Sequence, residues 1–263
     1  FSATRKELAQ SGIVGMTRGA AADKLLNYKP KPFRPGGRDQ RRQHDALMRF
    51  LLTTKTPVQE KLVLFWHDHF ATGITKLFAV NFGAATKLMG NQQKLLRKLA
   101  KGSMKDLVKA IGKDAAMMEF LDTTRNEKSI PNENYARELL ELYSIGRGLE
   151  GTLPPGTDEG DYVVYREEDV REAARVLSGW EFDEDFATID PDTNLPRGRV
   201  RGSVNNASSH DNDPKVFSDR FGNATIQPDP ALLNGGNPTE ASALDEISQL
   251  IEMIYAQPET ARH

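Results

Sequence analysis

The sequence predicts a mainly α fold: a multi-helix orthogonal bundle with a long irregular insertion before its C-terminal helices. Three observations support this prediction. Apolar residues recur at helical spacing through the first two thirds of the chain, capping residues precede several of these stretches, and helical spacing disappears between residues 181 and 238. The insertion allows for a short β-hairpin, because brief apolar pieces alternate there with Asp, Asn, Gly and Pro.

The composition excludes several classes of function. The chain of 263 residues is 38% hydrophobic and 27% charged, which suits a globular protein with a sizeable core. A formal net charge of -2 gives no general attraction to nucleic acid. The absence of cysteine excludes disulfides, thiolate chemistry and cysteine-ligated zinc. No run of about twenty apolar residues occurs, so no transmembrane segment is predicted in this chain.

The first part of the chain is predicted to contain two short helices and a linker. Thr4 and Thr17 are suited to cap the two helices. Residues 29–37 hold three prolines and two glycines, which indicates a linker, and helical spacing returns over residues 39–54. Six basic residues in and after the linker are either solvated or meet phosphates: Lys29, Lys31, Arg34, Arg38, Arg41 and Arg42.

The strongest helix start in the middle of the chain is Thr56, followed by Pro57 and Gln59. The helix that it begins is predicted to place five residues on one face: Val58, Leu62, Phe65, Trp66 and His69. Further helices are predicted over residues 82–100, 103–112 and 115–121.

The most informative stretch is residues 130–146, a predicted helix between Pro131 and Gly146 that we call the signature helix. Six residues form its apolar face: Tyr135, Ala136, Leu139, Leu140, Leu142 and Tyr143. The opposite face carries Glu133, Asn134, Arg137, Glu138 and Glu141. This face is either a solvated surface, with charges paired along the helix, or the wall of a functional site. In the second case Arg137 would fix the carboxylates of Glu133 and Glu141, and Glu133, Arg137, Glu138 and Glu141 are the catalytic candidates.

After the signature helix, residues 149–162 are predicted to be loop and residues 167–177 to be helix. Thr239 begins the last amphipathic helix, and Pro258 is predicted to begin another. This gives a single domain with a helical core over 1–180, an irregular acidic insertion over 181–238 and a returning helix over 239–263. An irregular segment of this length is either functional or tied down by an ion or a partner.

The histidines suggest a divalent metal site. His67 and His69 flank Asp68. In a helix that continues through them they point about 200° apart and cannot share a metal, whereas in an extended tail they lie on one side. His69 also fits a hydrogen-bonded core histidine. The hypothesis is a site built from His67, His69 and His210, with Glu138 from the signature helix.

Other motifs are absent or incomplete. Residues 190–194 begin like a calcium loop, but Leu195 stands where that loop needs glycine, and Arg201 where it needs a bidentate glutamate. No phosphate-binding loop, dinucleotide fingerprint, Gly-x-Ser-x-Gly elbow or His-Glu-x-x-His helix occurs. The residues therefore predict no particular reaction.

Several segments, in order, resemble the bacterial family called domain of unknown function 1800. They are residues 65–70 (Phe-Trp-His-Asp-His-Phe), 121–122, 131–139 (Pro-Asn-Glu-Asn-Tyr-Ala-Arg-Glu-Leu), 169–180, 210–215 and 258–262. The characteristic residues of the family map onto Trp66, His67, His69, Asp122, Asn132, Glu133, Asn134, Arg137, Glu138, Trp180, His210 and Asp211. No established role comes with them.

The resemblance implies a mostly helical fold and export to the periplasm, the cell surface or the medium. It also implies a partner, because members are often encoded beside an exported sulfatase-like family. The family extends beyond this chain, so both ends are expected to be truncated. Two functions follow as expectations. The first is an exported protein that acts with a partner through a polar His/Glu/Asn site, with or without a metal. The alternative is a non-catalytic assembly module of the cell envelope whose polar helix is a protein interface.

Overall fold

The computed structural model describes residues 48–80, 84–147, 156 and 158–261. The predicted N-terminal helices, the linker and the basic stretch lie outside the described residues. The chain divides into two compact units, Phe1–Phe65 and Trp66–His263, and the division falls within helix α4 (Pro57–His69). The insertion of residues 181–238 belongs to the second unit. The domain boundaries expected at residues 180 and 238 stay predictions.

In the first unit, the structure describes a helical stretch over residues 48–53 and the first part of α4. The α4 helix starts at Pro57, as predicted from Thr56, whose carbonyl accepts the first helical hydrogen bond. The predicted apolar face is only partly right here. Val58 is 70% exposed and Phe65 is 58% exposed, and the buried positions on α4 are instead Glu60 and Val63.

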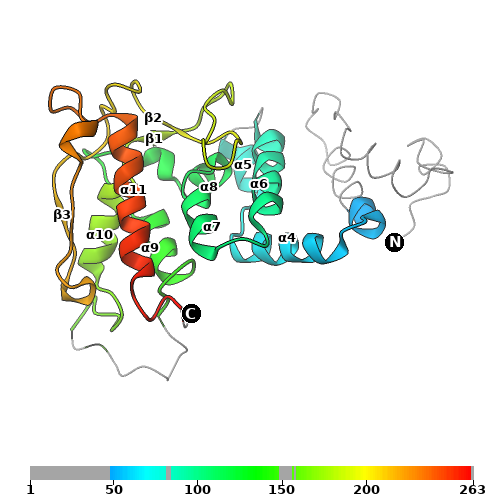
Figure 1. Cartoon of the computed structure of the whole chain (residues 1–263), viewed down its shortest axis with the longest axis horizontal. Helices are drawn as coiled ribbons and strands as arrows, with labels where there is room; N and C mark the ends of the chain where they lie inside the picture. The colour runs from blue at the N-terminus through cyan, green and yellow to red at the C-terminus, as the bar shows by residue number, and fades with distance from the viewer. Residues whose placement is uncertain (1–47, 81–83, 148–155, 157, 262–263) are drawn as a thin grey trace. The chain divides into compact units, whose positions relative to one another are not determined.

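The second unit is mainly α-helical, as the sequence predicts (Figure 1). After α4 its helices are α5 (Ile74–Val80), α6 (Ala85–Leu99), α7 (Met104–Ile111), α8 (Ala115–Phe120), α9 (Asn134–Glu141), α10 (Glu167–Val176) and α11 (Glu240–Tyr255), with a 3-10 turn η1 (Thr123–Arg125). Helix α5 is missing from the prediction. None of the described helices has the length and apolar character needed to span a membrane.

Side-chain caps fix where several helices begin. Ser103 accepts a hydrogen bond from the third residue of α7, Asp114 does the same for α8, and Thr239 does so for α11. Ser and Thr are frequent at this position because their side-chain oxygen accepts from a helical N–H that otherwise has no partner. These caps explain why the predicted boundaries of α7 and α11 are confirmed to within a residue or two.

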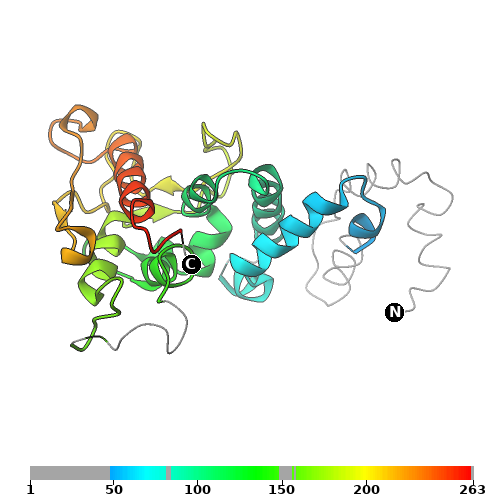
Figure 2. The same cartoon turned by 60° about the horizontal axis from the view of Figure 1, so that its bottom comes forward.

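The helices of the second unit pack in a few pairs. Helix α9 lies against α10, α11 lies against both α7 and α10, and α6 lies against α8. Figure 2 shows α11 running beside α7 and α10 when the molecule is turned. The signature helix α9 is therefore held by α10, which also contacts the short strand β3 (Lys215–Val216).

The insertion contains two antiparallel strand pairs and little other regular structure. Strand β1 (Trp180–Glu181) pairs with β2 (Arg199–Val200), and β3 pairs with β4 (Thr225–Ile226). Two 3-10 turns, η2 (Asp219–Phe221) and η3 (Pro230–Leu232), follow β3 and β4. The expected short hairpin is thus confirmed, and the insertion contains a second, separate strand pair.

Lysines from the helical core tie the insertion down. The buried ammonium of Lys113 forms an ion pair with Asp190 and lies 3.6 Å from a carboxylate oxygen of Asp192. Lys98 donates to the carbonyl of Thr193. The segment that begins like a calcium loop is therefore folded around a lysine ammonium of the same chain.

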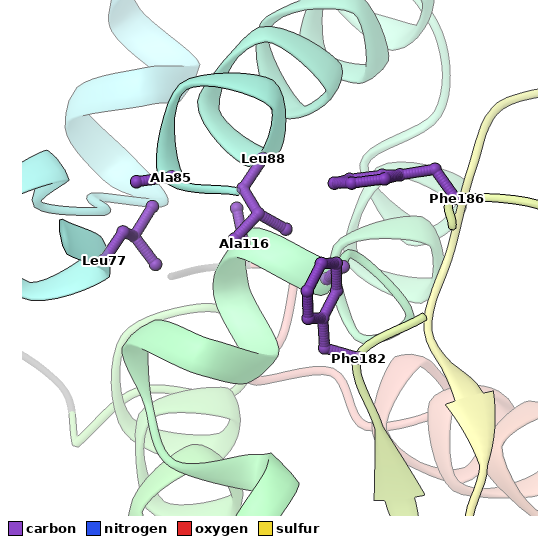
Figure 3. Close-up of a cluster of buried hydrophobic side chains, with 7 residues drawn as sticks. Leu77, Ala85, Leu88, Ala116, Phe182 and Phe186 are labelled. Carbon is purple, nitrogen blue, oxygen red and sulfur yellow. The ribbon is translucent and has the colours of Figure 1, made fainter. Parts of the chain in front are cut away.

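Aromatic residues from the insertion also complete a core cluster (Figure 3). Phe182 and Phe186 reach from the segment after β1 toward Leu88 of α6 and Ala116 of α8. Leu77, Ala85 and Ala115 belong to the same buried cluster. Burial of this apolar surface stabilises the arrangement of α5, α6 and α8 together with the start of the insertion.

The chain end differs from the prediction. Residues 256–261 form turns after α11, so no helix begins at Pro258 within the described residues. The side chain of Thr260 donates to the carbonyl of Ile254 at 2.6 Å, which bends the chain back onto the end of α11.

Candidate functional site

The loop before the signature helix is organised by Asn126, which is buried. Its side-chain oxygen accepts from the backbone N–H of Asn132 at 3.0 Å, and its side-chain nitrogen donates to the carbonyl of Ala174 in α10 at 2.7 Å. Its own carbonyl accepts from the N–H of Gly179 at 2.7 Å. Asn132 in turn accepts from the N–H of Asn134, the first residue of α9. This asparagine therefore fixes the start of α9 relative to α10.

The apolar face of the signature helix is nearly as predicted. Five of the six expected residues are buried: Tyr135, Ala136, Leu139, Leu140 and Tyr143. Leu142 is the exception, being 48% exposed, because α9 ends at Glu141 and the chain leaves the helical path there.

Arg137 organises the polar face, but its partners come from two helices. Its guanidinium lies 3.1 Å from a carboxylate oxygen of Glu133 and also donates to both carboxylate oxygens of Glu167 in α10. The hydroxyl of Tyr162 donates to Glu167 at 2.9 Å. The hydrogen bond from Arg137 lowers the pKa of Glu167, and the same bond raises the pKa of Arg137. The group is a charged network that joins α9 to α10.

The predicted pairing of Arg137 with Glu141 is wrong. Glu141 instead forms an ion pair with Arg147, at 2.8 Å, because Arg147 follows the end of α9 and turns back to its last turn. The neighbouring Tyr165 accepts a hydrogen bond from Arg147 at 3.1 Å. The carboxylates of Glu133 and Glu141 are therefore held by different arginines.

Glu138 differs from the other acidic residues of α9, since it forms no ion pair within the described part of the chain. Burial and then the nearby charge of Glu141 raise its pKa. Its charge adds to the effect of burial in raising the pKa of Tyr143. The ring of His69 lies 5.8 Å from the ring of Tyr143, so Glu138 and His69 share this tyrosine as a neighbour.

His67 and His69 both lie in the last turn of α4. The segment is therefore helical, and the extended tail that would place both imidazoles on one side does not form. Their side chains therefore point to different sides of the helix. Burial lowers the pKa of His67, and the adjacent Asp68 only partly offsets this. His69 packs edge-on against Phe70, with ring centroids 4.6 Å apart, as expected of a histidine at the margin of a core.

His210 is fully buried at a different place, beside α11. Its Nδ1 lies 2.9 Å from the carbonyl oxygen of Ser178, and its Nε2 lies 3.3 Å from a carboxylate oxygen of Glu246. The ammonium of Lys215 contacts the same oxygen of Glu246. The neighbours of His210 are thus a lysine and a glutamate that belong to β3 and α11.

The expected metal ligands do not gather into one site in the described residues. Over residues 48–80, 84–147, 156 and 158–261, no three His, Asp or Glu side chains are arranged so that they could hold a metal ion. His67, His69, His210 and Glu138 all fall within this range. Metal binding by these four residues therefore has no support from the geometry.

The signature segment does line a groove, which we call the α9–α10 groove. It has a volume of about 430 Å³ and is open to solvent. Its walls come from the start of α9, one face of α10 and β3: Pro131, Glu133, Glu168, Arg171, Glu172, Arg175 and Val216. Of the catalytic candidates, only Glu133 lies on this groove.

Most charges on the groove are already neutralised by neighbours. Arg175 contacts Glu172 at 2.6 Å and Asp211 at 2.7 Å, and Glu133 contacts Arg137. Arg171 differs, because it forms no ion pair with any described residue. The groove thus presents one arginine whose donors are available to a ligand.

The sequence reasoning missed Glu246 and the arginines of α10. For Glu246 a signal was present, because it lies four residues before Leu250 on the apolar stripe of α11, where a charged residue indicates a buried partner. Arg171 and Arg175 lie in the segment 169–180 that resembles the family, but nothing there distinguished them, because charged residues on a helix of this kind are common on solvated surfaces.

A family model described as "Protein of unknown function (DUF1800)" matches residues 4–263. No curated protein and no solved structure gives a significant match.

Proposed function

Because this chain belongs to the DUF1800 family, whose description assigns no activity, we propose its function from its own geometry: it is a binding module that holds a segment of a partner polypeptide in the α9–α10 groove. The observation that carries this proposal is Arg171, which lines the groove without an ion-pair partner among the described residues.

The chemistry of the groove favours a particular kind of segment. A guanidinium binds a carboxylate through two parallel hydrogen bonds, which an Asp or Glu side chain of the partner would supply. Beside Arg171, the groove presents Pro131 and Val216, and Val216 is 56% exposed. We infer an extended segment in which an acidic residue lies next to an apolar one.

The rigidity of the walls supports the same function. The Arg137 network joins α9 to α10, and Arg175 joins α10 to Asp211 in the insertion. A preformed groove spends less free energy on ordering its own side chains when a ligand binds. The polar face of the signature helix then has a role as scaffold, since it holds one wall in place.

The first partner to test is a protein of the exported sulfatase-like family, whose members are often encoded beside members of the family that this chain resembles. Export of both proteins remains part of the proposal, and fractionation of the source cells tests it: recovery of the chain only from the cytoplasm would contradict it.

The binding test compares charge reversal inside and outside the groove. Arg171→Glu is expected to weaken binding of the purified partner by about 30-fold, the effect of a central arginine worth about 2 kcal/mol. Lys101→Glu reverses a charge that is also exposed but does not line the groove, and it is the control. Val216→Asp and Val204→Asp form a second matched pair.

The binding titrations of these variants have three informative outcomes. Selective loss of affinity in Arg171→Glu and Val216→Asp supports the groove. Equal binding by all four variants and the unaltered chain overturns the groove as the site, and no binding by the unaltered chain overturns this choice of partner.

A further inference from the structure

Lys215, Glu246 and His210 form a cluster of three ionisable side chains that are each 0% exposed. Lys215 donates to the carbonyl of Asp211 at 2.5 Å and contacts Oε2 of Glu246. His210 Nε2 lies 3.3 Å from the same oxygen. Burying three ionisable groups costs free energy, and neither the groove nor the packing of α11 depends on them. What the cluster can do chemically depends on which of its atoms carry protons.

The hydrogen bonds around His210 indicate where a proton lies. The carbonyl oxygen of Ser178 can only accept, so Nδ1 carries the hydrogen that joins them. In a neutral imidazole, Nε2 is then an acceptor that needs a donor, and it is buried without a hydrogen-bond partner among the described residues. Glu246 Oε2 supplies that donor if it is the O–H of a carboxylic acid.

Glu246 also has few hydrogen-bond donors around it. Its Oε1 is buried and accepts no hydrogen bond from the described residues. A buried carboxylate is normally stabilised by N–H donors, and without them its desolvation is not offset. A neutral acid beside a neutral amine satisfies more of these atoms than an ion pair does.

A second buried pair in the same unit shows the contrast. Lys113 and Asp190 are also buried, but Asp190 Oδ1 accepts from the backbone N–H groups of Asp192 and Thr193, at 2.9 and 3.0 Å. Burial acts to raise the pKa of Asp190, but the hydrogen bonds from Lys113 and the backbone outweigh it and the pKa is lowered. That pair stays ionic.

We propose that Lys215 and Glu246 condense into an intramolecular amide that links β3 covalently to α11. The neutral Nζ attacks Cδ of Glu246, the Cδ–Oε2 bond breaks and Oε2 leaves as water. The water takes the proton that Oε2 already carries and one proton from Nζ, which His210 Nε2 transfers. The remaining N–H of the amide donates to the carbonyl of Asp211.

The fold supplies what this reaction needs. An amine and an acid held in contact react as one molecule, for which effective concentrations reach about 10⁵ M or more. Water is excluded, because all three side chains are fully buried and so are Ile247 and Leu250 on the same side of α11. No oxidant or cofactor is required.

Intact mass spectrometry of the full purified chain tests the proposal. The unaltered protein is expected to be lighter than its sequence by the mass of one water. Lys215→Arg is expected to have the full mass, which assigns the loss to this lysine rather than to cyclisation of an aspartate elsewhere. His210→Gln is expected to acquire the loss more slowly after synthesis.

Trypsin digestion after denaturation locates the bond. No Lys or Arg lies between Phe221 and Arg262, so an amide joins the peptide of residues 202–220, uncut after Lys215, to the peptide of residues 221–262. Normal cleavage after Lys113 serves as the internal control for an ionic pair. Full mass together with cleavage after Lys215 overturns the proposal, whatever the variants do.

Discussion

Asp114 gives the most quantitative prediction for the stability of this fold. It caps helix α8 and is 3% exposed, and its Oδ2 accepts from the N–H of Met117 at 2.9 Å and from the side chain of Gln92 at 3.0 Å. It forms no ion pair with the residues that the structure describes. Burial raises its pKa from 3.8 to about 7, against the smaller opposing effect of these hydrogen bonds.

The sign of the pH dependence follows from where the proton is held. Between pH 4 and pH 7 the folded chain keeps a proton on Asp114 that the unfolded chain has released, so the free energy of unfolding falls as the pH rises. The pKa difference is about three units at about 1.4 kcal/mol each, which gives a loss of about 4 kcal/mol as an upper limit. Above pH 7 to 8 the loss is complete and the curve levels.

The perturbation is Asp114→Asn. An asparagine caps a helix as well as an aspartate does, and its side-chain oxygen can keep both hydrogen bonds at Oδ2. It cannot titrate, so the variant lacks this part of the pH dependence. We therefore expect the free energy of unfolding of the variant, relative to that of the unaltered protein, to rise by up to about 4 kcal/mol between pH 4 and pH 8.

Urea unfolding at each pH from 4 to 8 measures the difference. Every other titrating group is common to both proteins, so subtraction isolates Asp114. Asp106→Asn, at an exposed position on α7, is the control and should change the pH dependence little. If the free energy of unfolding depends on pH in the same way for Asp114→Asn and the unaltered chain, the reasoning about this buried carboxyl is refuted.

Two further changes test how the insertion is held. Gly179→Ala is expected to cost at least about 2 kcal/mol, because Gly179 has a φ of +79° and a Cβ there would lie 2.5 Å from the backbone nitrogen of His210. Gly235→Ala has a similar φ of +57° but open space, so a thermal melt should show a smaller loss, and equal losses would contradict the close approach. Lys113→Met is expected to cost about 3 kcal/mol in urea unfolding, because it leaves the buried Asp190 without its cation; a loss below about 1 kcal/mol would show that the pair contributes little.

The sequence predicts those parts of the fold that local chemistry determines. Helices α7 and α11 have capping residues, and all three of α7, α10 and α11 have amphipathic spacing within their own segments, so their bounds follow from the sequence. Helix α5 (Ile74–Val80) does not, since it is short, holds β-branched residues and has no clear cap. Its position depends on burial of Leu77 in a core that distant residues complete.

In the candidate site, too, local sequence predicts some features, and others depend on residues from distant elements. The buried and polar faces of α9 follow from helical spacing, and so does the pair of Arg137 with Glu133, but the partners that come from other elements do not. Arg137 pairs with Glu167, and His210 with Glu246, and both partners lie in other elements. A pattern within one helix cannot reveal them, because it carries no information on which helix packs beside it.

Lys113 has a consequence for how the insertion responds to its surroundings. A loop that folds around a free cation follows mass action, so its stability changes with the concentration of the ion. Here the cation is part of the chain, and its effective concentration is set by the geometry of α7 and does not change on dilution or with the ionic composition of the medium. The Asp190 loop should therefore form together with the helical core and keep its shape wherever the protein is carried.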